Sequence, residues 1–170
     1  MRPRKEVNAL VRSGVPYEKI SVIRHEMVRE GMLTYGCREV IGNPKEAAQL
    51  ANQLFRNADR EMVLVISFAS TMLPIAIEIA AVGTVRKCIV DVPEVFKTAI
   101  INSAAGIMIF HNHPSGNCKP SIDDLNLTKR MKEAGKLLGI PLYDHIICAT
   151  DGSFFSFCDE GLLNEKVSES

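Results

Sequence analysis

The chain has 170 residues, enough for one domain with its own hydrophobic core and too few for two full domains. Its 20 basic and 20 acidic residues leave no net charge, so charge gives nucleic-acid binding no support, although a local basic patch could still contact a polyanion. The five cysteines are scattered and never form a CxxC pair, which argues against a disulfide framework and a cysteine-based zinc finger. No apolar run approaches the roughly 20 residues that span a bilayer, so we expect a cytoplasmic protein without membrane contact.

The pattern along the chain predicts three parts. Residues 1–42 are charged with a weak helical periodicity and are expected to form an N-terminal helical extension, residues 43–163 the domain, and residues 164–170 a polar tail. The domain begins with a helix start, in which Asn43 is the N-cap, Pro44 the first helical residue and Glu46 the acid three residues after the cap. Apolar residues follow at helical spacing, at positions 47, 50, 51, 54 and 55.

Three strands and a helix are expected next. Residues 62–68 form a β-branched run without alternation, which predicts a strand covered on both faces. Residues 75–80 and 85–90 also favour strands, with Gly83 between them as a turn or bulge. After Pro93, the spacing of Val95, Phe96, Ala99 and Ile100 predicts the buried face of a helix.

The second half of the domain alternates between strand and helix. Residues 107–110 are a short apolar strand that leads into the polar loop His-Asn-His-Pro-Ser-Gly. A helix is expected from 122 to 138, capped by Ser121 and ended by Gly139, with its buried face at Leu125, Met131, Ala134 and Leu138. Residues 142–149 and 153–157 predict two strands joined by a Thr-Asp-Gly turn. We therefore expect an α/β domain with a central mixed sheet flanked by helices.

Two histidines in the polar loop indicate a metal site. His111 and His113 are two residues apart, so in an extended chain both imidazoles project to one side and can approach one ion. Zinc accepts neutral imidazole and carboxylate ligands, and a catalytic site leaves one position for water. Asp124 is the candidate carboxylate because it lies in the first turn of the helix after the loop, whereas Asp123 points about 100° away.

The stretch from His111 to Asp124, HNHPSGNCKPSIDD, closely resembles the JAMM signature, H-x-H-P followed by S-x-x-D. More narrowly it resembles the RadC branch of the JAB/MPN superfamily, which HNHPSG, the segment EVFK at 94–97 and the segment DHII at 144–147 also favour. The resemblance covers about residues 43–163. It implies a JAB/MPN, cytidine-deaminase-like architecture in which His111, His113 and Asp124 bind Zn²⁺.

The same resemblance implies an upstream glutamate that acts through the metal-bound water. We assign Glu61 to that role because it begins the first buried strand, with Glu78 and Glu94 as alternatives. Ser121 matches the serine that supports the oxyanion. These parts together predict a zinc-dependent peptidase or isopeptidase-like hydrolase that acts on a peptide or protein substrate.

A second function from another class stays open. RadC-like proteins are associated with DNA repair, so the chain could be a repair or recombination accessory protein that uses the fold as a binding module. Such proteins usually begin with a helix-hairpin-helix region, and residues 1–42 contain no corresponding Gly-rich hairpin. Exposed strand edges would also allow a homo-oligomer.

Several candidate residues also have plainer interpretations. Asp124 could cap its helix, since S-x-x-D is a helix-start pattern, and Glu61 could be an exposed residue at a strand start. His145 is expected to be a hydrogen-bonded structural residue near the site, with Asp144 orienting it. Cys118 lies in the loop as a soft potential ligand, but we interpret it as incidental.

Overall fold

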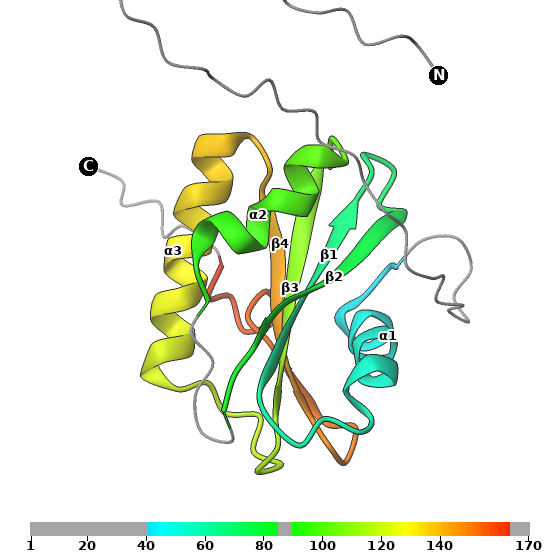
Figure 1. Cartoon of the computed structure of the whole chain (residues 1–170), viewed down its shortest axis with the longest axis vertical. Helices are drawn as coiled ribbons and strands as arrows, with labels where there is room; N and C mark the ends of the chain where they lie inside the picture. The colour runs from blue at the N-terminus through cyan, green and yellow to red at the C-terminus, as the bar shows by residue number, and fades with distance from the viewer. Residues whose placement is uncertain (1–40, 85–89, 164–170) are drawn as a thin grey trace, which may run out of the picture.

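The computed structural model of the chain describes residues 41–84 and 90–163, which form three helices and one five-stranded sheet (Figure 1). The elements are α1 (Pro44–Phe55), β1 (Met62–Phe68), β2 (Pro74–Val82), α2 (Val92–Ile101), β3 (Gly106–His113), α3 (Ile122–Leu138), β4 (Leu142–Ala149) and β5 (Phe154–Ser156). The strand predicted for 85–90 falls outside the described residues except for Val90, which is in no strand. The tail at 164–170 and the extension, apart from residues 41 and 42, also lie outside them.

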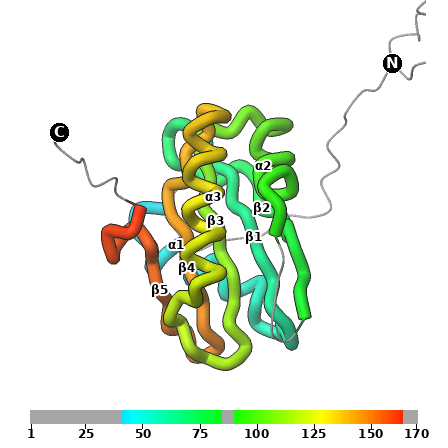
Figure 2. The backbone as a smooth tube through the Cα atoms, turned by 90° about the vertical axis from the view of Figure 1, so that its left-hand side faces the viewer, coloured from blue at the N-terminus to red at the C-terminus, as the bar shows by residue number. Residues whose placement is uncertain are grey.

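The sheet is mixed, as predicted. Its strand order is β2-β1-β3-β4-β5, and β3 and β4 are parallel while the other neighbours are antiparallel. Because α3 connects the two parallel strands, it lies along the sheet beside them, on the same face as α2 (Figure 2). Helix α1 covers the opposite face (Figure 1). None of the helices in the described residues is long and apolar enough to cross a membrane.

The start of α1 agrees with its sequence pattern. The Asn43 side chain accepts a hydrogen bond from the backbone N–H of Glu46 at 2.9 Å, and the Glu46 carboxylate accepts one from the backbone N–H of Gly42 at 3.0 Å. These bonds satisfy donors that a helix start otherwise leaves unpaired. The face that the helix buries comprises Ala47, Ala48, Leu50, Ala51 and Phe55.

Strand β1 is covered on both faces, which confirms the prediction from its unbroken apolar run. Val63 and Val65 belong to the core beneath α2 and α3, whereas Leu64 and Ile66 belong to the core beneath α1. Strand β3 alternates in the same way, with its odd-numbered residues on the α2 and α3 side. This alternation determines which face receives the polar residues at the end of β3.

The predicted buried face of α3 is partly wrong. Of its four expected residues only Met131 is fully buried, and Leu125 and Leu138 are 42% and 44% exposed. The buried positions are Thr128, Met131 and Gly135, a narrow stripe at i, i+3 and i+7. Gly135 lies in this stripe and lets the helix approach its neighbours closely. Ile100 of α2, also expected to be buried, is 53% exposed.

Gly135 marks the closest approach of α3 to the chain that follows it. A Cβ atom there would lie 2.6 Å from the backbone oxygen of Ile140 and 3.4 Å from the Phe96 ring. Alanine favours a helix over glycine by about 1 kcal/mol, but overpacking against backbone costs up to about 3 kcal/mol. We expect Gly135→Ala to lower the free energy of unfolding by about 2 kcal/mol in urea titrations. Lys129→Ala on the exposed side of α3 is the control, and a Gly135→Ala variant as stable as the wild type would contradict this packing.

Candidate metal centre

The end of β3 carries both candidate histidines. The strand continues to His113, three residues beyond its predicted end, so His111 and His113 are both in extended backbone. Following the alternation of β3, their side chains lie on the face that α3 covers. The loop after β3 then leads to the N-terminus of α3, at the same end of the sheet (Figure 1).

Three predicted ligands come together at this end of the sheet. The Nε2 atoms of His111 and His113 are 2.8 Å apart, and Asp124 lies with Oδ1 at 3.2 Å from His111 Nε2 and Oδ2 at 3.7 Å from His113 Nε2. One ligand atom from each residue lies within 4.8 Å of the others, and no other such group occurs among the described residues. His111 is buried, and the other two are partly buried. The three residues that the sequence pattern indicated therefore lie close together in the structure, while their role as metal ligands stays a prediction.

Ser121 holds the carboxylate of Asp124 in place. The backbone N–H and the hydroxyl of Ser121 both donate to Oδ2 of Asp124 at 2.7 Å, and the Asp124 N–H donates back to the Ser121 hydroxyl at 3.2 Å. Burial raises the pKa of Asp124, but the adjacent His111 ring and the hydrogen bonds from Ser121 lower it by more, so the net pKa lies below its ordinary value. Asp124 therefore caps its helix and still turns Oδ1 toward the histidines.

The donor set suits a metal ion. Nδ1 of His113 lies 2.6 Å from the backbone oxygen of Asn117, which can only accept a hydrogen bond, so Nδ1 carries the hydrogen and neutral His113 has a lone pair on Nε2. That lone pair faces a second imidazole nitrogen and a carboxylate. Such a group of electron-rich atoms is stable only around a proton or a cation. Two imidazoles and one carboxylate are the ligands that catalytic zinc sites use.

A further buried histidine touches this group. His145 Nε2 lies 2.8 Å from His111 Nδ1, and His145 Nδ1 lies 2.6 Å from the Thr128 hydroxyl, which donates to the backbone oxygen of Asp124 at 2.7 Å. Burial holds the pKa of His145 well below its ordinary value. His145 is outside the candidate ligand group, in agreement with the role predicted for it. Thr128, one helical turn after Asp124, was not among the residues predicted for the site.

Asp144, predicted to orient His145, contacts the backbone of that residue and not its ring. Asp144 Oδ1 accepts hydrogen bonds from the backbone N–H groups of His145 and Cys158, at 2.7 and 2.9 Å, and Oδ2 accepts one from the Ser156 hydroxyl at 2.6 Å. Burial raises the pKa of Asp144 although these bonds oppose it. Asp144 therefore connects β4 to Ser156 in β5 and to Cys158 after it. The His145 ring stacks on Phe157, with ring centroids 4.7 Å apart.

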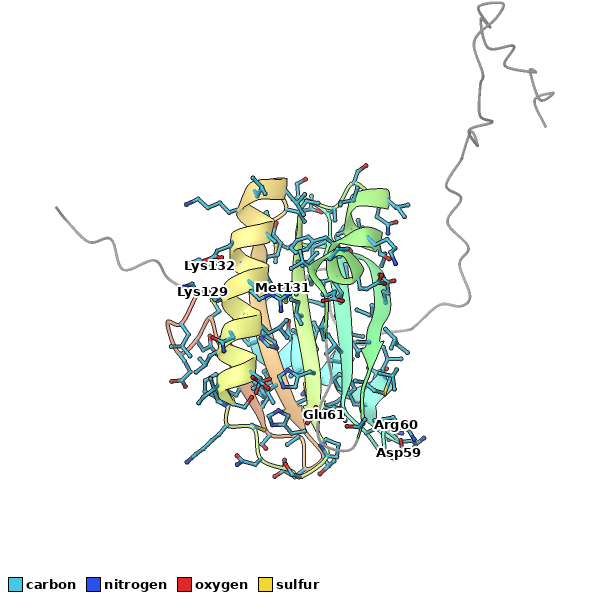
Figure 3. The ribbon with its side chains drawn as sticks, turned by 60° about the vertical axis from the view of Figure 1, so that its left-hand side comes forward. Asp59, Arg60, Glu61, Lys129, Met131 and Lys132 are labelled. Atoms are coloured by element: carbon cyan, nitrogen blue, oxygen red, sulfur yellow. The ribbon has the colours of Figure 1, made fainter. Side chains whose placement is uncertain are left out.

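Glu61 precedes β1 at the same end of the sheet as the candidate ligands (Figure 3). Val63 is paired with His111 in an antiparallel arrangement, so the residue two before Val63, Glu61, lies toward the same end of the sheet as His113, two residues after His111. The Asn112 side chain bridges the two strands there by bonding the backbone of Met62 at 2.7 Å. Figure 3 places Glu61 at the lower end of β1, at the same end of the sheet as the β3–α3 loop.

The alternative glutamates lie elsewhere. Glu78 is in β2 opposite Val65, which is itself opposite Ile109, so it stands midway along the edge strand and two strands away from β3. Glu94 is in the first turn of α2, where its carboxylate pairs with Lys97 at 2.6 Å. Position along the sheet therefore favours Glu61.

Cys118 is outside the candidate ligand group. Its Sγ lies 3.2 Å from the hydroxyl of Ser153, in the turn between β4 and β5. The grouping of His111, His113 and Asp124 does not include the thiol. This position agrees with our interpretation of Cys118 as incidental to the metal site.

Comparison with known proteins identifies the family. The family model of the RadC-like JAB domain matches residues 41–162. The chain belongs to the RadC-like JAB domain family. This RadC-like domain is 44% identical over 123 residues to a UPF0758 protein of Clostridium acetobutylicum, covering 72% of this chain and 53% of that protein. It is 38% identical over 126 residues to a UPF0758 protein of Shouchella clausii, covering 74% and 54%. The chain thus spans about half the length of these curated relatives, and the predicted resemblance is confirmed.

Proposed function

We propose that this RadC-like JAB domain is a zinc-dependent hydrolase of the peptidase or isopeptidase type. The observation that carries the proposal is the convergence of His111, His113 and Asp124 within 4.8 Å at the end of β3. Three protein ligands from imidazole and carboxylate match the composition of catalytic zinc sites, which keep a further position for water. Amide bonds in peptides or proteins are the substrate class that such a site suits.

The nitrogen and carboxylate ligands would have separate tasks. His111 and His113 would bind the metal through Nε2, and Asp124 would bind it through Oδ1 and supply the negative charge. Zn²⁺ held there lowers the pKa of water to about 7 and polarises a carbonyl group. His111 is buried and the other two ligands are partly buried, which limits contact with bulk water and so strengthens the electrostatic interactions among them.

Glu61 would transfer the proton, and Ser121 would stabilise the negative charge that develops on the carbonyl oxygen. The Glu61 carboxylate takes a proton from the attacking water and passes it to the leaving amine, the usual work of a general acid and base. The Ser121 hydroxyl, which rests on Asp124 Oδ2, would turn toward the substrate carbonyl and donate to its oxygen. Asp124 Oδ2 would keep its second donor, the Ser121 backbone N–H, throughout.

Zinc content and peptide cleavage test the proposal together. We expect the wild-type protein to hold about one zinc per chain and to cleave members of a peptide library. His113→Ala removes one ligand, so zinc affinity should fall by more than about 100-fold and cleavage should be lost. Cys118→Ser is the control in the same loop, since its thiol lies outside the ligand group, and it should keep both properties.

The two readouts separate the parts of the proposal. Stoichiometric zinc in His113→Ala would show that the metal binds elsewhere and would overturn the site. A zinc-loaded wild type that cleaves neither peptides nor isopeptide-linked proteins would overturn the hydrolase and leave the metal centre standing. Cleavage that persists after complete zinc removal would show that another group performs the reaction.

A further inference from the structure

We propose that Thr128 and His145 form a hydrogen-bond relay that determines which nitrogen of His111 carries hydrogen, and so keeps His111 Nε2 free for a metal ion. The relay deepens the proposed metal centre and rests on it. Its members are an α3 hydroxyl and a β4 imidazole that contact each other and His111 but belong to no group of candidate ligands in the described residues. We call this series of hydrogen bonds, from the backbone oxygen of Asp124 through Thr128 and His145 to His111, the tautomer relay.

The direction of the tautomer relay follows from its first atom. The backbone oxygen of Asp124 can only accept a hydrogen bond, and the Thr128 hydroxyl lies 2.7 Å from it. Thr128 has a single hydroxyl hydrogen, which this bond uses. The same oxygen atom lies 2.6 Å from His145 Nδ1, so it must accept there, and His145 Nδ1 must carry a hydrogen.

The second step follows from the surroundings of His145. Its side chain is fully buried and stacks on the Phe157 ring at an interplanar angle of 8°. A neutral imidazole has one N–H, so with the hydrogen on Nδ1 the Nε2 atom of His145 is an acceptor. His111 Nδ1, 2.8 Å away, must then be the donor. Neutral His111 is left with a lone pair on Nε2, the atom that faces His113 and Asp124.

His113 also carries its hydrogen on Nδ1, but it has a different hydrogen-bond partner. Its Nδ1 donates to the backbone oxygen of Asn117 at 2.6 Å, a bond within the loop that follows β3. Both histidines thus offer Nε2, but the partner of His111 is buried and made of side chains from α3 and β4. Because the tautomer relay starts at Asp124, it also connects two of the three candidate ligand residues. A hydrogen-bond partner of this kind orients a ligating imidazole and raises its basicity.

Thr128→Val is the decisive variant because it keeps the shape of the side chain and removes the hydroxyl. The His145 Nδ1–H then loses its acceptor, so the hydrogen is expected on Nε2, where it points at His111. His111 Nδ1 becomes the acceptor, and the His111 hydrogen sits on the atom that should bind the metal. We expect zinc affinity, measured by competition with a chelating dye, to fall by about 10- to 100-fold. Thr128→Ser keeps the hydroxyl and should restore the wild-type affinity.

Nitrogen-15 NMR of the imidazoles shows directly which ring nitrogen of each histidine carries the hydrogen. The spectra are recorded on metal-free and on zinc-loaded protein. We expect the hydrogen of His145 on Nδ1 in the wild type and in Thr128→Ser, and on Nε2 in Thr128→Val. A wild-type His145 with its hydrogen on Nε2 would overturn the relay. So would a folded Thr128→Val variant with unchanged tautomer and unchanged zinc affinity.

The two readouts also keep this inference apart from the proposed function. If the wild type binds no zinc, the proposed function fails, but the His145 spectrum of the metal-free protein still decides whether the relay exists. If Thr128→Val does not give a folded circular dichroism spectrum, the wild-type spectrum decides. A normal tautomer relay with no zinc binding would therefore support the relay and reject the metalloenzyme.

Discussion

Replacing Glu61 with glutamine is expected to lower kcat/KM for peptide hydrolysis by about 100- to 10,000-fold while zinc stays bound. Glutamine keeps the shape of the side chain but cannot take a proton from water or return one to the leaving amine. Glu61 is outside the group of metal ligands, so the metal content should not change. Steady-state kinetics and zinc analysis of the same preparation give both quantities.

Two other glutamates serve as matched controls for this result. Glu94→Gln removes an exposed carboxylate that pairs with Lys97, and Glu78→Gln removes one in the middle of β2. Neither should change kcat/KM appreciably, because neither stands beside His113 in the sheet. If Glu78→Gln or Glu94→Gln abolished hydrolysis and Glu61→Gln did not, the assignment of the proton carrier to Glu61 would be wrong.

The second large effect is expected on stability. Asp144→Ala leaves the backbone N–H groups of His145 and Cys158 without their acceptor, in a place where water does not reach Asp144. An unsatisfied buried donor costs about 1–3 kcal/mol, so the free energy of unfolding should fall by about 3 kcal/mol in urea titrations. The loss should also loosen the segment after β5 that carries Phe157, the stacking partner of His145.

Asp144→Asn distinguishes the effect of the hydrogen-bond acceptor atoms of Asp144 from the effect of its negative charge. Asparagine keeps an oxygen for the two N–H groups, and its amide can donate to the Ser156 hydroxyl, which is free to rotate. We expect it to cost clearly less than Asp144→Ala. Equal destabilisation by both substitutions would show that the charge of Asp144, and not its acceptor atoms, stabilises this corner of the fold.

The parts of the fold that could be predicted depend on neighbours in the chain. The start of α1 follows from Asn43, Pro44 and Glu46, which contact one another within one turn. The predicted strand–helix–strand order of β3, α3 and β4 supplies the crossover connection that parallel neighbouring strands need. The strand predicted at residues 153–157 was found, three residues long, at 154–156.

The parts that could not be predicted depend on contacts between distant segments. The buried face of α3 was misplaced because the close approach at Gly135, and not the hydrophobic pattern of the helix alone, selects the stripe that faces the sheet. The further partners of Asp144, Ser156 and Cys158, were not predicted because they come from a later segment. Side chains near the site therefore found partners that no local pattern indicated.

By itself the sequence determined the candidate ligands, since the two-residue spacing of His111 and His113 in extended backbone puts them on one side, and the helix start puts Asp124 in its first turn. Only the tertiary structure decided what surrounds them. The antiparallel pairing of β1 with β3 brings Glu61 to the end of the sheet that carries His113, and the packing of α3 on β4 brings Thr128 to His145. The physical reason is that ligand spacing is a property of local backbone geometry, whereas proton positions depend on hydrogen bonds between elements far apart in the chain.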